Sequence, residues 1–246
     1  MRLKENKKLD LKSPRFLVDH NLNKEIEPYD VLNFLNRASA NAFVGTSGSG
    51  KTSLMYSFLM NTKPKIWKKQ FENIIVVMPQ ASRNSLKNNI FDKYVESSNL
   101  YDDLTEDAID RITEQITDNA TDGYNTLLIL DDVASALKNP YIAKKLQHLV
   151  YAYRHYKTVI LILVQTLKTI PLSIRKNLTN LVVFHKPRIS EWDAITEEFL
   201  EMEKKESQKL YDLIFDKKYG WTLINLNSGR IFKEFDEVLY KNLDDK

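Results

Sequence analysis

The chain has 246 residues, a hydrophobic fraction of 43% and a formal net charge of +3. That length suits one large α/β domain with a full core, and the hydrophobic fraction argues against a wholly disordered chain. The sequence has no cysteine, which excludes disulfides and thiol catalysis, and its four histidines are scattered without ligand spacing, which argues against a metal other than Mg²⁺.

The sequence predicts no membrane-spanning segment and no secretion signal. Its longest apolar run, Val159–Val164, has the length of a strand and falls far short of the roughly 20 residues that cross a bilayer. The N-terminus is charged and lacks the apolar stretch of a signal peptide. We therefore expect a protein that is not secreted.

Charge is unevenly distributed along the chain. Residues 1–15 and residues 63–69 form two basic clusters, and the second contains an aromatic residue. Either cluster is a candidate for phosphate contacts or is simply solvated surface. Residues 102–122 are rich in acidic residues. This pattern predicts a solvent-exposed helix face that points away from any bound polyanion.

Residues 1–37 are predicted to form an N-terminal extension, and residues 38–246 a single domain. The domain is predicted to begin with a buried strand at 41–45, which a helix at 51–61 follows. The segment that joins them matches the phosphate-binding loop pattern G-x-x-x-x-G-K-[ST]. The strand, loop and helix order favours a nucleotide site over a glycine and serine linker.

Each part of this loop has a predicted role in binding ATP. Gly45 and Gly50 are predicted to allow backbone angles that a Cβ would forbid, so that amide N–H groups turn toward a phosphate. Lys51 is predicted to contact the β- and γ-phosphates, and the Thr52 hydroxyl is predicted to ligate Mg²⁺. The predicted nucleotide-binding residues are Gly45, Thr46, Ser47, Gly48, Ser49, Gly50, Lys51, Thr52 and Ser53.

A second half of the site is predicted further along the chain. A strand at 73–78, a helix from near Ser82, a helix at 107–117 and a strand at 126–131 come next. Two acidic residues, Asp131 and Asp132, stand at the carboxyl end of the strand at 126–131. This is the edge where ligands bind in open α/β sheets. Asp131 is predicted to hold Mg²⁺ through water, and Asp132 to orient and deprotonate the attacking water. A helix cap or turn is the alternative interpretation of this pair.

The next predicted strand, at 158–164, follows a helix at 140–155 and ends at Gln165. An amide at that edge could hydrogen-bond the attacking water or the γ-phosphate, so Gln165 is a candidate sensor. Arg154 precedes the strand and Arg175 follows it. Either could act as an arginine finger on a neighbouring subunit's ATP, or could form a structural salt bridge.

The tail is predicted to contain a strand at 180–184, a charged helix at 191–215 and a hairpin of strands at 221–225 and 230–233. Continuous apolar strands separated by helices indicate a parallel sheet that is covered on both faces. The predicted fold class is therefore α/β, a P-loop NTPase three-layer sandwich with a mostly parallel central sheet. The C-terminal helix and β-hairpin are expected to pack on this single ATPase domain.

Together these motifs resemble the FtsK/HerA superfamily, and most closely the genome-packaging ATPases of poxviruses, other large nucleocytoplasmic DNA viruses and virophages. The resemblance covers roughly residues 40–225. A glutamine-ended strand preceded by an arginine separates this family from other P-loop proteins. The matching segments are 45–52, 74–79, 128–132, 154–165 and 174–177 leading to 183–184.

The resemblance implies a motor, assembled as a homo-oligomeric ring of five or six subunits, that pulls double-stranded DNA into a capsid. It implies ATP and Mg²⁺ as cofactors, capsid or portal-vertex proteins as partners, and the host cytoplasm, at the viral factory, or the virion as location. It assigns Gln165 as sensor and favours Arg154 as the trans finger. Cellular members usually have Asp-Glu where this chain has Asp131-Asp132, and the shorter Asp132 leaves the identity of the base open.

Other classes of P-loop protein remain as alternatives. They are a nucleic-acid ATPase of the helicase or loader type, a nucleotide kinase, and an ATP-dependent scaffold that binds DNA or capsid protein without translocating. The sequence lacks the arginine-rich lid of a kinase, the Asn-Lys-x-Asp motif of a GTPase and the Leu-Ser-Gly-Gly signature of an ABC ATPase. DNA-stimulated ATP turnover would distinguish a motor from the other classes.

Overall fold

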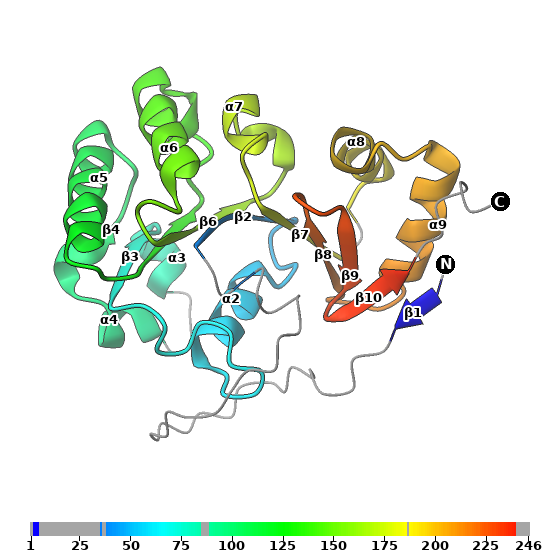
Figure 1. The fold of residues 1–246 in the computed structure, drawn as a ribbon, viewed down its shortest axis with the longest axis horizontal. Helices are drawn as coiled ribbons and strands as arrows, with labels where there is room; N and C mark the ends of the chain where they lie inside the picture. Colours follow the sequence, from blue (N-terminus) through cyan, green and yellow to red (C-terminus); the bar gives the residue numbers. More distant parts are fainter. Residues whose placement is uncertain (1, 5–34, 36–37, 85–88, 186, 240–246) are drawn as a thin grey trace.

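The computed structural model describes residues 2–4, 35, 38–84, 89–185 and 187–239. In this part of the chain a ten-stranded sheet runs through the molecule, with helices on both of its faces (Figure 1). The strand order is β1-β10-β9-β8-β7-β2-β6-β5-β3-β4. The strands are β1 (Arg2–Lys4), β2 (Ser39–Val44), β3 (Asn73–Val77), β4 (Leu100–Tyr101), β5 (Thr126–Asp131), β6 (Thr158–Val164), β7 (Asn180–Phe184), β8 (Trp221–Asn225), β9 (Arg230–Lys233) and β10 (Asp236–Leu239).

Helices connect most of the parallel strands. The α-helices are α2 (Lys51–Met60), α3 (Gln80–Asn84), α4 (Ile90–Tyr94), α5 (Glu106–Thr121), α6 (Pro140–Ala152), α7 (Leu172–Arg175), α8 (Ile189–Leu200) and α9 (Lys204–Ile214). Three short 3-10 helices are η1 (Ser97–Asn99), η2 (Ala136–Lys138) and η3 (Leu167–Thr169).

The sheet has a parallel part and an antiparallel part that meet at β7. Five pairings among the described strands, from β7 through β2, β6, β5 and β3 to β4, are parallel. Four pairings, from β7 through β8, β9 and β10 to β1, are antiparallel. The predicted α/β sandwich with a mostly parallel sheet and a C-terminal hairpin is therefore confirmed.

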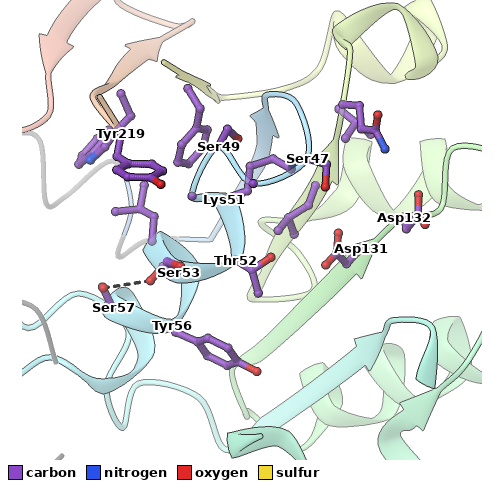
Figure 2. A pocket seen from close by; sticks show the side chains of 18 of the residues that line it. Ser47, Ser49, Lys51, Thr52, Ser53, Tyr56, Ser57, Asp131, Asp132 and Tyr219 are labelled. Atoms are coloured by element: carbon purple, nitrogen blue, oxygen red, sulfur yellow. Dashed lines mark hydrogen bonds between the residues drawn. The ribbon is translucent and has the colours of Figure 1, made fainter. Parts of the chain in front are cut away.

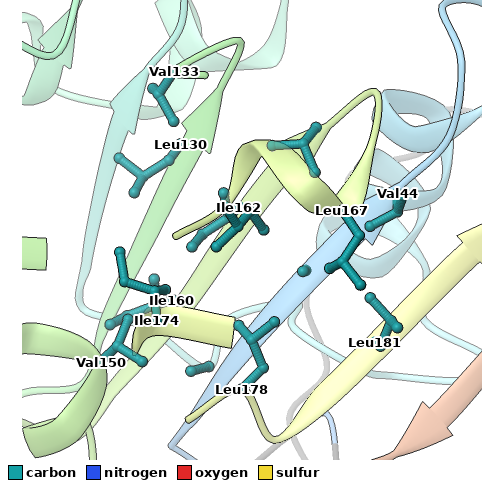
Figure 3. Packing of buried hydrophobic residues seen from close by; sticks show 14 of the residues in the cluster. Val44, Leu130, Val133, Val150, Ile160, Ile162, Leu167, Ile174, Leu178 and Leu181 are labelled. Atoms are coloured by element: carbon teal, nitrogen blue, oxygen red, sulfur yellow. The ribbon is translucent and has the colours of Figure 1, made fainter. Parts of the chain in front are cut away.

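Each face of the sheet has its own apolar core. Helices α2 and α4 cover one face, where Phe43, Phe58 and Trp67 are fully buried. Helices α5 to α9 cover the other face (Figure 1). Figure 3 shows this second core, in which strand residues such as Ile160 and Ile162 pack against Val150 and Ile174 from the helices. Because both faces are buried, the central strands are continuous apolar runs.

A row of buried asparagines crosses the sheet at the join between its two parts. Asn180 on β7 donates from Nδ2 to Asn41 Oδ1 on β2 at 2.8 Å and accepts at Oδ1 from Asn225 Nδ2 on β8 at 2.9 Å. Asn41 in turn donates to the Ile160 carbonyl on β6 at 3.1 Å. These three side chains are at most 3% exposed, and their mutual bonds satisfy polar groups that would otherwise be costly in a core. The row thus links four strands through their side chains.

The charged helix expected at 191–215 is two helices in the structure. Glu201 adopts a left-handed φ of +51° after α8, and the Met202 N–H returns to the Thr196 carbonyl at 3.2 Å. This left-handed residue ends the helix without a glycine. Helix α9 then packs back on α8, where Trp192 Nε1 donates to the Ser207 carbonyl at 2.9 Å.

Three short strands, β1, β4 and β10, were not expected. They contain two to four residues each, too few for a periodic apolar pattern. Strand β1 lies within the predicted N-terminal extension and pairs with β10, whereas residues 5–34 of that extension, including most of the first basic cluster, lie outside the described residues.

The second basic cluster has an aromatic residue that is unsuited to contact nucleic acid. Trp67 is 1% exposed, packs edge-on against Phe58 at 5.1 Å, and donates from Nε1 to the Leu35 carbonyl at 2.8 Å. It belongs to the core and is not available to a ligand, whereas phosphate contacts by the lysines around it stay a prediction. The acidic segment does form an outward face, since α5 buries Ile109, Ile112 and Ile116. No helix in the described ranges combines the length and apolarity that a bilayer crossing requires.

Candidate functional site

The loop between β2 and α2 has the backbone of a phosphate-binding loop. Gly48 and Gly50 adopt left-handed φ values of +73° and +107°, which a residue with a Cβ rarely adopts. Gly45 has a different reason to be glycine. A Cβ there would lie 2.7 Å from Ser49 Oγ and 2.8 Å from Phe184 Cβ, so close packing, and not the predicted backbone angle, excludes a side chain.

The backbone N–H groups at the start of α2 present partial positive charge to this loop. Gly50 occupies the N-cap position and provides no side chain to cap the helix, and the first turn contains no acid. Among the described residues, the first N–H of the helix with a backbone partner is that of Leu54, which donates to the Gly50 carbonyl at 2.9 Å. A helix N-terminus of this kind, which follows a glycine-rich turn, is an anion-binding arrangement.

Lys51 folds its side chain back over the loop. Its ammonium donates to the Gly45 carbonyl at 2.6 Å and to the Thr46 carbonyl at 3.1 Å. Partial burial lowers the pKa of Lys51, and the negative charges of Asp131 and Asp132 oppose that shift. The cation is therefore held at the mouth of the loop, within the field of both carboxylates.

The register of the sheet brings the other predicted residues to the same edge. Val44 pairs with Val164, and Leu163 pairs with Asp131, so β2, β6 and β5 end at one level. The Gly45 N–H donates to the Val164 carbonyl at 3.1 Å, which fixes the start of the loop against β6. Gln165 and Asp132, the residues that follow β6 and β5, therefore lie beside the phosphate-binding loop.

A cavity of about 1320 Å³ lies over this edge. Residues 47–53 of the loop and helix line it together with Asp131, Asp132 and Gln165. Figure 2 shows Asp131 and Thr52 facing one another, with Asp132 farther from the loop. The volume exceeds the roughly 300–1,000 Å³ that is usual for small-ligand sites, so a nucleotide fits with room to spare.

The two adjacent acids have different surroundings. Asp131 is partly buried at the end of β5, and this burial raises its pKa to about 6, although the Lys51 ammonium opposes the rise. Asp132 is exposed and adopts a left-handed φ of +58°. This conformation is uncommon for a residue other than glycine, and it ends the extended strand at Asp131.

Two tyrosines that belong to none of the predicted motifs, Tyr56 and Tyr219, also line the cavity. Tyr56 lies one turn along α2, ring to ring with Phe91 at 5.3 Å, and burial raises its pKa. Its hydroxyl has no hydrogen-bond partner among the described residues. Tyr219 comes from the loop between α9 and β8. The position of Tyr56 on the helix after the motif was a usable signal, whereas nothing in the sequence relates Tyr219 to the loop at 45–53.

Neither candidate arginine finger lies in the cavity formed by its own chain. Arg175 on α7 pairs with Glu198 on α8 at 2.5 Å, and its side chain is 15% exposed. Arg154 is exposed in the turn before β6, where its Nε donates to the Tyr153 hydroxyl at 2.9 Å. Since the cavity lies at the far end of that seven-residue strand, Arg154 is roughly 20 Å from it.

Solved structures share this fold. B204, described as the DNA-packaging ATPase from Sulfolobus turreted icosahedral virus, matches with a TM-score of 0.59 and 15% identity, over 84% of this chain and 100% of that one. The genome packaging NTPase B204 from Sulfolobus turreted icosahedral virus 2, in complex with AMPPCP, matches with a TM-score of 0.57 and 16% identity, over 83% and 99%. The pCW3 conjugation coupling protein TcpA, with ATPgS, matches with a TM-score of 0.57 and 13% identity, over 81% and 60%.

Sequence comparison gives a more specific result. A search of curated proteins finds no match. The family model described as Poxvirus A32 protein matches residues 29–245, which include the phosphate-binding loop, both acids, Gln165 and the C-terminal hairpin. Because this match spans most of the chain, the protein belongs to the poxvirus A32 protein family.

Proposed function

We propose that the protein hydrolyses ATP and uses the energy to translocate double-stranded DNA into a preformed capsid. The observation that carries this proposal is the convergence of Lys51, Thr52, Asp131, Asp132 and Gln165 on one cavity at the carboxyl edge of the sheet. Membership of the A32 family supports the packaging role. The structural relatives are named as DNA-packaging and conjugation coupling proteins. Two of them, B204 from Sulfolobus turreted icosahedral virus 2 and TcpA, were solved with ATP analogues.

The residues at this edge suit Mg²⁺ together with a nucleotide. Thr52 and Asp131 face one another and offer a hydroxyl and a carboxylate oxygen, the ligand type that Mg²⁺ prefers (Figure 2). Mg²⁺ would supply charge neutralisation between the β- and γ-phosphates. Partial burial disfavours the charged form of Asp131 and raises its pKa. A cation bound beside this carboxylate would stabilise the charged form.

The remaining residues divide the work of hydrolysis. The backbone amides at the start of α2 would hold the phosphates together with the Lys51 ammonium. To do so, the ammonium would replace its bonds to the Gly45 and Thr46 carbonyls with bonds to phosphate oxygens. Asp132 is free of the strand and would accept the proton of the attacking water. The Gln165 amide would orient that water or contact the γ-phosphate, and so report hydrolysis to β6 and its neighbours.

The assembly that we propose is a ring of five or six identical subunits around double-stranded DNA. A ring is supported by the position of Arg154, which is too far from its own site to act there and is exposed for a neighbour. Capsid or portal-vertex proteins would be the other partners, at the viral factory in the host cytoplasm or in the virion. A motor that acts on any sequence should grip DNA through its phosphates.

The test is ATP turnover by the purified protein with and without double-stranded DNA of unrelated sequences. We expect Mg²⁺-dependent hydrolysis that DNA stimulates, with a DNA affinity that falls steeply with salt and hardly varies with sequence. Lys51→Ala is the control, because it removes the phosphate-binding cation without touching the core, and it should abolish turnover.

Three results would contradict the proposal. Turnover of Lys51→Ala near the wild-type rate would mean that the site is elsewhere. Transfer of phosphate to a nucleoside acceptor in place of water would indicate a kinase. ATP turnover that no DNA stimulates, in a protein that stays monomeric with ATP and DNA, would remove the ring motor.

A further inference from the structure

The cavity has a second side that the catalytic residues do not use. In Figure 2 the phosphate-binding loop lies between Tyr219 on one side and Asp131 and Asp132 on the other. The γ-phosphate must lie next to the two acids, because the attacking water and the cation act there. An extended nucleotide whose phosphates cross the loop therefore directs its base away from the acids, toward Tyr219.

The segment that bears Tyr219 forms the wall at this side. Lys217, Lys218 and Tyr219, from the loop between α9 and β8, line the cavity together with Phe184 and Trp221. The Tyr219 ring reaches the phosphate-binding loop itself, since its Cδ1 lies 4.0 Å from the position that a Cβ on Gly50 would take. The C-terminal part of the domain thus lies next to the nucleotide-binding motif and shares its cavity.

The backbone holds this ring in place. Tyr219 adopts a left-handed φ of +63°, a conformation that is rare for an aromatic residue. The turn around it is fixed on two sides. The His185 N–H, just after β7, donates to the Gly220 carbonyl at 2.8 Å, and Lys217 pairs with Glu234 between β9 and β10 at 2.9 Å. Strain of this kind persists where the surrounding structure enforces it, and it concentrates at functional sites.

The exposure of the ring is also informative. Tyr219 is 56% exposed, although it lies beside a cavity in a protein with two large cores. The Lys218 ammonium lies over the ring, 4.9 Å from its centre, which adds positive charge beside the aromatic surface. An accessible aromatic surface with a cation next to it suits a ligand that carries both a flat base and phosphates.

We propose that Tyr219 is the base-stacking residue of the nucleotide site, and that the loop at 217–219 recognises the purine base of ATP. This inference rests on the proposed function, since it requires the phosphates to bind at residues 47–53. It assigns the C-terminal segment a role in binding the nucleotide, in addition to its role in extending the sheet beyond β7. The contact is made by the ring and not by the hydroxyl.

The experiment compares two ligands, Mg²⁺ with ATP and Mg²⁺ with inorganic tripolyphosphate, by titration calorimetry. Tyr219→Ala removes the ring, Tyr219→Phe keeps it, and Tyr219→Gly removes it while relieving the left-handed backbone. We expect ATP to bind Tyr219→Ala and Tyr219→Gly about tenfold more weakly, because both substitutions remove the ring on which the base stacks. Tripolyphosphate should bind all variants equally, and Tyr219→Phe should match the wild type.

Tyr124→Ala is the matched control. Tyr124 is 46% exposed in the turn before β5, at the opposite edge of the sheet, so its loss should leave both affinities unchanged. Unchanged ATP affinity in both Tyr219→Ala and Tyr219→Gly would overturn the inference. Equal loss of ATP and tripolyphosphate affinity would overturn it too, since it would show that the loop supports the phosphate site. A wild-type protein that binds neither ligand would instead refute the proposed function.

Discussion

At the scale of single residues, the site separates two neighbouring carboxylates by burial and backbone conformation. Asp131 ends a buried strand, and its pKa of about 6 reflects loss of solvent, whereas Asp132 is exposed at φ +58°. A carboxylate that lacks solvent gains most from a cation, and one that stands free can accept a proton. We propose that the two aspartates therefore have different roles, Asp131 toward the cation and Asp132 toward the attacking water.

Asp132→Asn should separate nucleotide binding from hydrolysis. Asparagine tolerates a left-handed φ, so the substitution should not disturb the turn, and Asp131 can still hold the cation. ATP affinity should stay within about twofold of the wild type, while turnover should fall about 100-fold or more with the loss of a general base. Calorimetric titration and steady-state ATPase rates measure the two effects.

Asp122→Asn, an exposed substitution in the turn after α5, serves as the control for this pair of measurements. A parallel loss of nucleotide affinity in Asp132→Asn would show that Asp132 is a metal ligand. An unchanged rate would mean that another group takes the proton.

Residues that belong to a contiguous motif were predictable, and residues that reach the site through the tertiary fold were not. The loop at 45–53 and the acids at 131–132 are each recognisable from a short run of residues at the end of a predicted strand. Because the carboxyl ends of parallel strands meet at one edge of the sheet, the sequence also predicts that the two motifs lie close together. Tyr219 depends on how β8 pairs with β7, which brings residues far apart in sequence together. Even at Gly45, the sequence shows that glycine is needed but not that Ser49 and Phe184 are the reason.

At the scale of elements, the buried asparagine row joins the parallel and antiparallel parts of the sheet. Asn180 is bonded to Asn41 on one side and Asn225 on the other, and Asn225 Oδ1 also accepts from the Ser228 N–H in the hairpin turn at 3.0 Å. A slip of one residue in either pairing would turn these amides toward the opposite face and leave them without partners. The row therefore specifies register as well as contributing stability.

Asn180→Ala should destabilise the fold strongly for a single polar substitution. It leaves Asn41 Oδ1 and Asn225 Nδ2 without these partners in a core where each unsatisfied group costs roughly 1–3 kcal/mol. We expect the free energy of unfolding to fall by about 2–4 kcal/mol in urea denaturation. Asn227→Ala, in the exposed part of the hairpin turn, should change it by less than about 0.5 kcal/mol. A loss below that limit in Asn180→Ala would show that the row contributes little.

Elements with strong patterns were predicted well, and those that depend on pairing partners were not. Strands β5 and β6 are continuous apolar runs and were placed by sequence alone. Strands β1, β4 and β10 exist because a neighbouring edge offers hydrogen bonds, which no local pattern records. The break between α8 and α9 was missed because Glu201, a good helix former, adopts the left-handed conformation there.

At the scale of the whole molecule, the protein has its candidate nucleotide cavity at the carboxyl edge of the sheet and Arg154 at the opposite edge. Arg175, by contrast, is engaged by Glu198. If the site uses an arginine finger, as we propose, a neighbour has to present its own Arg154 to the cavity. Activity should then depend on assembly.

Mixing two inactive variants tests this dependence. Lys51→Ala subunits have a defective site and an intact arginine, and Arg154→Ala subunits have the reverse. Each alone should show little turnover, whereas the mixture should regain part of it, because an arginine finger is worth roughly 10³ to 10⁵ in rate. Normal hydrolysis by Arg154→Ala alone would exclude this residue, and the same mixing experiment with Arg175→Ala would follow.

The two outermost strands of the sheet set a limit on how such subunits can join. Within the described residues, strand β1 has three residues and β4 has two, so neither of these edges offers a long row of unpaired backbone groups. Edge strands this short discourage one copy from extending its sheet into the next, a route that leads to open-ended stacks. Neighbouring copies would then meet through side chains on helices and loops. Contacts of that kind can change with each cycle of ATP hydrolysis, because no backbone hydrogen bonds between strands have to break.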